Sequence, residues 1–191
     1  MTRRRALLWI LLLISATMAL PLIKWVIFVV RRPNLGKLKE LEPLIDELVD
    51  TIIPITDSPG AKEAGVGRFV VGKVMFFMDR SAQNFFIDGL EEVNRMSFKH
   101  YGKAFAKCTL EQRLDTLNDL ENRELILHPL LMKVKYKLFG FPFISYLKAY
   151  TIEGYCTSEL GATRCLNYQA VPLNYQPCIP IEPGQRSWAT K

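Results

Sequence analysis

At 191 residues, with 49% hydrophobic and 23% charged side chains, the chain is long enough for one domain with a core and too apolar to be disordered. Six basic residues at the ends of an apolar N-terminal segment account for the formal net charge of +6, so the remaining body is close to neutral. A nucleic-acid-binding domain would be expected to carry a basic patch on its folded part, and the sequence shows none.

Residues 1–32 are predicted to form a membrane anchor or an export signal. Residues 6–23 contain no charged side chain, and a helix of that length spans about 27 Å, close to the roughly 30 Å hydrocarbon core of a bilayer. A cleaved signal peptide is the alternative, with residues 17–19 as a passable small-residue cleavage site. The apolar run continues well past that site, which favours an uncleaved anchor.

Paired arginines stand at the start of this segment. Arg3 and Arg4, together with Leu7, match part of a twin-arginine export signal, although Ala6 stands where that signal usually has phenylalanine. The same arginines can instead form the cytoplasmic flank of an anchor under the positive-inside rule. Both interpretations place the rest of the chain on the periplasmic side of a bacterial inner membrane.

Residues 33–43 are predicted to be a linker and the start of a helix, and residues 44–155 a helical domain. Apolar side chains at spacings of three and four put one face of the first helix into a core, and they are Leu38, Leu41, Ile45, Leu48 and Ile52. Pro43 fits best in the first turn of the main part of this helix, where a proline costs little. The helix is expected to end before Pro54.

A turn and two further helices are expected next. In the turn at 56–60, Gly60 is expected to take a positive φ. The apolar run at 66–78 fits a buried strand or a buried helix, and we interpret it as a helix because its neighbours are helical. Ser81 is the expected N-cap of a long helix after it.

The second half of the domain also reads as helical. Thr109 and Gln112 form a capping-box pattern before another apolar periodicity. A basic, aromatic segment follows Pro129, and Pro142 can open a final helix that runs to Gly154. Because no strand-like alternation appears, the predicted fold class is all-α, a helical bundle.

The C-terminal residues, 156–191, are predicted to form an irregular arm. Prolines at 172, 177, 180 and 183 exclude a long helix or a central strand here. The predicted organisation is therefore an N-terminal membrane or signal helix, a helical domain and an extended, proline-rich arm.

No catalytic, cofactor-binding or metal-binding residues can be assigned from the sequence. The stretch at 65–67, Gly-Val-Gly, is a weak match to a dinucleotide-binding fingerprint and fits a helix entrance better. His100 and His128 lie in separate segments without metal-ligand spacing. The sequence therefore predicts no catalytic site in this chain.

Four cysteines follow the apolar segment, and an even number in an oxidising compartment favours disulfides. Cys156 with Cys165 is the first pairing expected. Cys178 could pair with Cys108 or with a partner chain. A metal or iron–sulfur site is the alternative, although the spacings are not those of a cluster motif.

Two blocks of sequence resemble a known family. The first covers residues 44–54 (LIDELVDTIIP), 56–61 (TDSPGA) and 64–66 (AGV), and the second covers residues 151–158 (TIEGYCTS), Gly161, Tyr168 and residues 184–189 (GQRSWA). Together they resemble the opening and the C-terminal signature of the gluconate 2-dehydrogenase subunit 3 family. The residues between them match only in their helical character.

The resemblance implies a non-catalytic small subunit of a membrane-associated FAD-dependent sugar or alcohol dehydrogenase. A large partner subunit would hold FAD, and electrons would leave through a cytochrome c subunit with haem c or through a quinone. Members of this family often carry the twin-arginine signal for the pair, so the implied roles are export, maturation and membrane attachment of the flavoprotein.

On this interpretation the C-terminal arm is the expected partner interface. The aromatic residues of the arm and of the position just before it are of the types enriched at interface hot spots, and they are Tyr155, Tyr168, Tyr175 and Trp188. The alternative is that these aromatic side chains pack on the helices of their own domain. The alternative function is a self-contained, membrane-anchored redox or scaffold protein that binds a cofactor through its cysteines.

Overall fold

The computed structural model describes residues 19, 31–125, 141–171, 178, 180–181 and 183–189. The described residues are helical, with no strand beyond one isolated bridge between Asn167 and Trp188, so the all-α prediction is confirmed. The elements are α2 (Leu35–Glu40), α3 (Glu42–Ile52), α4 (Val66–Phe77), α5 (Arg80–Tyr101), the 3₁₀ turn η1 (Phe105–Lys107), α6 (Leu110–Leu125), α8 (Phe143–Thr157) and the π-helical turn η2 (Gly161–Cys165).

The predicted N-terminal anchor lies outside the described residues, apart from residues 19 and 31–32. Among the helices that the structure does describe, none combines the length and the apolar composition that crossing a membrane requires. The basic, aromatic segment after Pro129 also lies outside the described residues.

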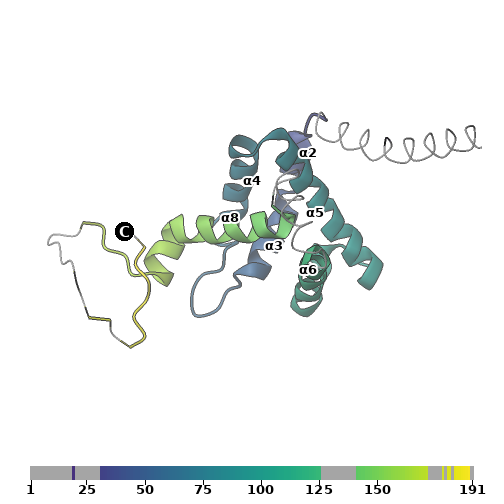
Figure 1. Cartoon of the computed structure of the whole chain (residues 1–191). Helices are drawn as coiled ribbons and strands as arrows, with labels where there is room; N and C mark the ends of the chain where they lie inside the picture. The colour runs from purple at the N-terminus through teal and green to yellow at the C-terminus, as the bar shows by residue number, and fades with distance from the viewer. Residues whose placement is uncertain are drawn as a thin grey trace, which may run out of the picture.

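Helices α3, α4 and α8 pack against one another, and α5 lies against α4, α6 and α8 (Figure 1). Their shared core is built from buried side chains, and its fully buried members include Leu38, Ile45, Leu48, Val70, Val74, Phe86, Leu90 and Leu147. Helix α8 crosses the body, and from its end the C-terminal residues extend away from the bundle (Figure 1). The chain therefore consists of a compact helical body and a segment that projects from it.

Several helix boundaries agree with the sequence. The backbone NH of Thr109 donates to the Gln112 side chain (3.1 Å), and the NH of Gln112 donates to the Thr109 hydroxyl (3.4 Å), which is the predicted capping box. Pro142 precedes the first residue of α8. The run at 66–78 is helix α4, and Gly65 is its N-cap with a φ of 69°.

Other boundaries differ from the prediction. Pro43 lies in the first turn of α3, as predicted, but the first helix is divided at Leu41 into α2 and α3. Asp79 caps α5 by accepting from the NH of Ala82 (3.3 Å), which places Ser81 inside the first turn. After a break at the extended Ser158, helical backbone resumes and ends at Cys165, so the irregular C-terminal segment begins later than predicted.

Gly60 does not have the positive φ that the sequence predicted. Among the described residues, the glycines with a positive φ are Gly65, Gly102 and Gly184. Instead, a Cβ at Gly60 would lie 2.8 Å from the Ile55 side chain and 3.0 Å from its backbone nitrogen. The loop after α3 therefore folds back on itself so closely that glycine is needed for space.

Two glycines inside helices allow a matched test of the packing. A Cβ at Gly89 of α5 would lie 2.4 Å from Cγ and 2.8 Å from Cβ of Phe143, whereas a Cβ at Gly72 of α4 would meet nothing within 4 Å. Alanine gains about 0.5–1 kcal/mol over glycine inside a helix, so Gly72→Ala is expected to raise the free energy of unfolding. Gly89→Ala is expected to lower it by about 1–3 kcal/mol, because buried Phe143 must shift. Chemical denaturation of the two variants checks this, and equal stabilisation by both would contradict the packing of α5 on α8.

Candidate partner interface

A pair of backbone hydrogen bonds closes the C-terminal residues into a loop. The NH of Asn167 donates to the carbonyl of Ser187 (2.9 Å), and the NH of Ala189 donates to the carbonyl of Asn167 (2.9 Å). The Asn167 amide also donates to the carbonyl of Arg186 (3.0 Å), and the Arg186 guanidinium donates to the carbonyl of Arg164 (2.6 Å). We call the described residues from 166 to 189 the C-terminal loop, whose two ends are thus held together beside η2.

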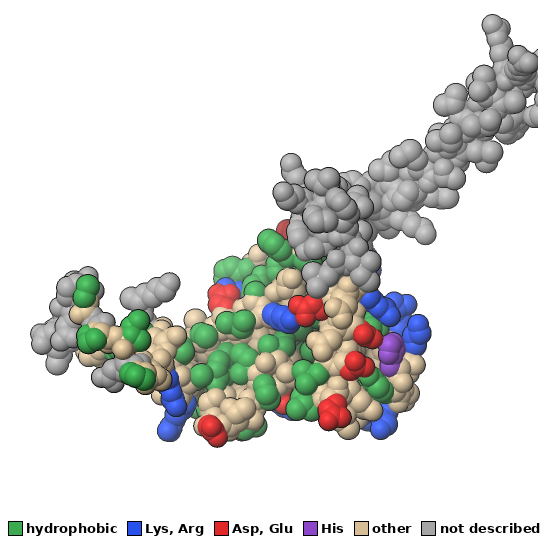
Figure 2. Space-filling view, turned by 60° about the horizontal axis from the view of Figure 1, so that its bottom comes forward, with side chains coloured by type: hydrophobic (Ala, Val, Ile, Leu, Met, Phe, Trp, Pro, Cys, Tyr) green, Lys and Arg blue, Asp and Glu red, His purple; other side chains and the backbone are tan. Residues whose placement is uncertain are grey.

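The C-terminal loop carries apolar side chains that the helical body does not cover. Tyr168 is 51% and Trp188 45% exposed, and the aliphatic Val171 and Ile181 are 69% and 89% exposed. Figure 2 shows hydrophobic side chains on this loop, at the left of the view and away from the body. Exposed aromatic and aliphatic side chains on a segment without its own core are typical of a protein–protein contact.

Tyr155 does not belong to this surface, contrary to the prediction. It is 5% exposed, and its hydroxyl donates to the carbonyl of Pro59 (2.6 Å). The cause is that α8 continues past this position, which turns the ring toward the loop after α3. Burial raises the pKa of the Tyr155 phenol. Tyr175, the remaining predicted contact, lies outside the described residues.

The predicted disulfide between Cys156 and Cys165 is not formed, because all four cysteines are free thiols. Cys156 lies within α8, whereas Cys165 ends η2 and its thiol lies within hydrogen-bonding reach of the Tyr155 phenol. Cys108 is buried, with its thiol directed at the carbonyl of Ala104 (3.5 Å), and Cys178 is exposed. Within the described part of the chain, no three His, Cys, Asp or Glu side chains gather as a metal site.

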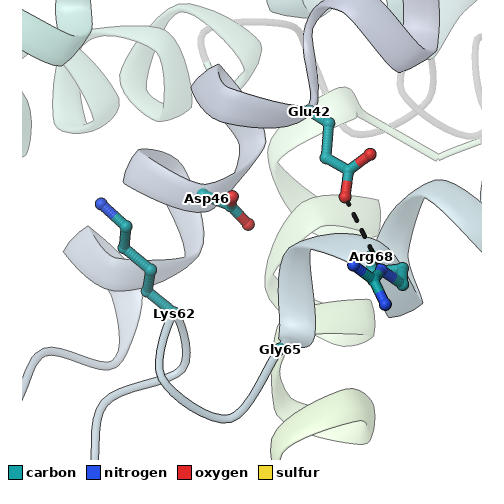
Figure 3. Close-up of a pocket in the computed structure, with 5 residues that line it drawn as sticks. All are labelled: Glu42, Asp46, Lys62, Gly65 and Arg68. Atoms are coloured by element: carbon teal, nitrogen blue, oxygen red, sulfur yellow. Dashed lines mark ion pairs between the residues drawn. The ribbon is translucent and has the colours of Figure 1, made fainter.

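A polar hollow of about 320 Å³ lies where α3 and α4 begin, lined by Glu42, Asp46, Lys62, Gly65 and Arg68. Figure 3 shows the Asp46 carboxylate directed from α3 toward α4, whereas the Lys62 side chain points away. The Arg68 guanidinium lies 3.9 Å from Glu42. Burial, with a smaller contribution from Glu42, raises the pKa of Asp46.

Gly67 explains why Asp46 can sit so close to α4. A Cβ at that position would lie 1.9 Å from Asp46 Oδ1. The Gly-Val-Gly stretch at 65–67 is a helix entrance, as the sequence indicated, and bends and turns precede it in place of the strand of a dinucleotide fold. Its second glycine also leaves room for the Asp46 carboxylate. The hollow is lined by two carboxylates and two cationic side chains, so their charges compensate one another.

An ion-pair cluster beside this hollow ties the elements together. Glu47 of α3 accepts from the Lys62 ammonium (2.6 Å) and from the Arg113 guanidinium (2.6 Å). Arg113 of α6 also donates to the carbonyls of Cys108 (3.1 Å) and Ala106 (2.8 Å). The Arg113 and Glu47 side chains are only 14% and 20% exposed, so the pair joins α3, η1 and α6 in a poorly solvated position.

Sequence reasoning identified Tyr168 and Trp188 but missed their neighbours. Val171 and Ile181 extend the exposed apolar surface, and Asn167 closes the loop. A usable signal was that each of these apolar residues is adjacent to a proline. The pairing of Asn167 with residues near the C-terminus had no counterpart in local sequence pattern.

These features define a small helical protein that projects a closed loop with exposed apolar side chains. The family model described as gluconate 2-dehydrogenase subunit 3 matches residues 39–173. The chain therefore belongs to the gluconate 2-dehydrogenase subunit 3 family, as its two sequence blocks indicated. No curated protein and no solved structure matches it. Membership in a family of third subunits implies a multi-subunit dehydrogenase complex.

Proposed function

We propose that this chain is the non-catalytic small subunit of a periplasmic, membrane-associated, FAD-dependent dehydrogenase complex. It binds the large flavoprotein subunit, aids that subunit's export and maturation, and attaches it to the inner membrane. A cytochrome c subunit with haem c, or a quinone, receives the electrons. FAD belongs to the partner, and this chain contributes binding surfaces.

The observation that carries the proposal is the C-terminal loop, in a chain of this family. Tyr168 and Trp188 lie on opposite ends of the loop, and the bridge at Asn167 brings them together. Aromatic side chains that are already positioned lose little conformational entropy on binding. A partner that covers them removes apolar surface from water, which is the main favourable term in association.

Purification of the chain from its native membrane tests the proposal. The tagged chain is solubilised in mild detergent, and co-eluting proteins are identified by mass spectrometry. We expect a large flavoprotein in the same fraction. Recovery of the chain alone, from membranes that contain the flavoprotein, would overturn the proposal.

Export of the partner depends on the paired arginines if they act as a twin-arginine signal. Replacing Arg3 and Arg4 with lysine keeps the positive charge of an anchor flank but removes the paired guanidinium groups. We expect the large subunit to remain in the cytoplasmic fraction. The control replaces Arg31 and Arg32 with lysine at the other end of the apolar segment, and there export is expected to be unchanged. Normal export by the first variant would show that Arg3 and Arg4 serve only as a flank.

A further inference from the structure

Helix α4 ends in two exposed phenylalanines that the body leaves uncovered. Phe76 is 78% and Phe77 75% exposed. Both lie in the last turn, just before the short link to α5. Adjacent exposed aromatic side chains at one edge of a folded body mark a contact surface, since water disfavours them.

Two neighbouring residues of α5 connect this edge to the point where the apolar N-terminal segment ends. The Gln83 amide donates to the carbonyls of Val74 and Met75 (both 3.0 Å), which holds the end of α4. The next residue, Asn84, donates to the carbonyl of Arg31 (2.8 Å). Figure 1 shows the start of α2 and the link between α4 and α5 at the same end of the body. Adjacent residues of α5 therefore hold both the backbone of Arg31 and the last turn of α4, which carries Phe76 and Phe77.

The charges at this edge suit an anionic lipid surface. Arg31, Arg32 and Arg80 are all exposed. Of the acids nearby, Asp79 caps α5 through the NH of Ala82, and Asp88 lies 3.6 Å from the Arg31 guanidinium. Arginine at the surface attracts acidic headgroups, and phenylalanine is among the apolar side chains that membrane-surface helices bury at the boundary between headgroups and acyl chains.

We infer that Phe76 and Phe77, flanked by Arg31, Arg32 and Arg80, lie in the headgroup region of the bilayer, so that this edge of the body rests on the membrane surface. The inference rests on the proposed membrane attachment through residues 1–32, and it adds an orientation. With this edge against lipid, the C-terminal loop projects from a different side of the body, where a partner subunit can reach it (Figure 1).

Tryptophan fluorescence of the full-length chain in vesicles tests the orientation. Phe77→Trp places a fluorophore at the edge, and Phe98→Trp is the matched control, because Phe98 is 56% exposed and lies about 27 Å further along α5 than Arg80. Both are reconstituted into phosphatidylglycerol–phosphatidylcholine vesicles with brominated acyl chains. The spectrum of the unaltered chain is subtracted from each. We expect the added emission of Phe77→Trp to be blue-shifted and quenched by bromine, and that of Phe98→Trp to be neither.

Flotation of the same vesicles separates the possible failures. If the chain floats with the vesicles but the added emission of Phe77→Trp is unquenched, the orientation is wrong and the membrane attachment stands. If the chain does not float, the membrane attachment is wrong and the orientation is overturned with it. A blue shift of Phe77→Trp that appears only when the flavoprotein is added would assign this edge to the partner and overturn the inference. Circular dichroism of both variants confirms that the helices are retained.

Discussion

Replacement of Tyr168 and Trp188 by alanine is expected to weaken binding of the large flavoprotein subunit by at least about 30-fold, since truncating an interface hot spot costs about 2 kcal/mol or more. Both side chains are about half exposed in the isolated chain, so the loss of either leaves the helical core intact. The Asn167–Trp188 bridge next to Tyr168 survives the substitutions, because its hydrogen bonds use main-chain groups. Titration of the tagged chain with purified flavoprotein measures the effect.

A matched control separates the C-terminal loop from other exposed aromatic residues. Phe98→Ala removes a side chain of similar exposure from α5, on the helical body. We expect its binding constant to equal that of the unaltered chain. Equal binding by the Tyr168 and Trp188 variant would show that the partner docks elsewhere and that the C-terminal loop is not the interface.

Arg113→Met is expected to lower the free energy of unfolding by about 2–4 kcal/mol. The substitution keeps much of the aliphatic volume but leaves Glu47 with Lys62 as its only cationic hydrogen-bond partner in the described structure. It also removes the donors to the carbonyls of Cys108 and Ala106. Breaking a poorly solvated ion pair on one side is costly, because the other charge stays behind. Arg95→Met is the control, since Arg95 is 77% exposed in its pair with Glu92 and is expected to change stability by less than about 1 kcal/mol.

The loss of folding stability caused by Arg113→Met should depend on pH. Burial alone would raise the pKa of Glu47, but the hydrogen bonds from Lys62 and Arg113 outweigh it and hold the pKa below its usual 4.5. Stability from this carboxylate is therefore present above pH 4.5 and is lost as the pH falls through the lowered pKa. Thermal melts, all recorded in the same detergent, measure the melting temperature of the variant and of the unaltered chain at each pH. The difference between the two melting temperatures should become smaller toward acid pH. A gap that is constant from neutral to acid pH would show that the ion pair does not carry the effect.

Local chemistry accounts for what could be predicted of the fold. The capping box at Thr109 and Gln112 and the proline before α8 act within one turn, so the sequence alone locates them. The helix at 66–78 followed from the context of its neighbours. The division of the first helix at Leu41 and the N-cap at Asp79 were not predicted. In each case, residues only a few positions apart can serve as the helix start, and packing decides which of them does.

At the candidate interface, residue type alone does not determine which aromatic side chains are exposed. Tyr168 and Trp188 were identified by residue type, and their exposure agrees with that interpretation. Tyr155 has the same residue type, but the continuation of α8 and a hydrogen bond to Pro59 bury it. The Glu47–Arg113 pair joins helices far apart in the chain, and no spacing rule reaches that far. Long-range packing thus decides which aromatic residues are left for a partner.

The flavin content of the purified complex shows whether FAD belongs to the large subunit and this chain is a non-catalytic partner. The tagged chain is purified from its native membrane, its absorbance spectrum is recorded, and the subunits are then separated and recorded again. We expect a flavin spectrum in the complex that stays with the large subunit, while this chain is colourless and free of metal. A flavin, haem or iron–sulfur spectrum that stays with this chain after separation would overturn the proposed function and favour a redox protein that binds its own cofactor.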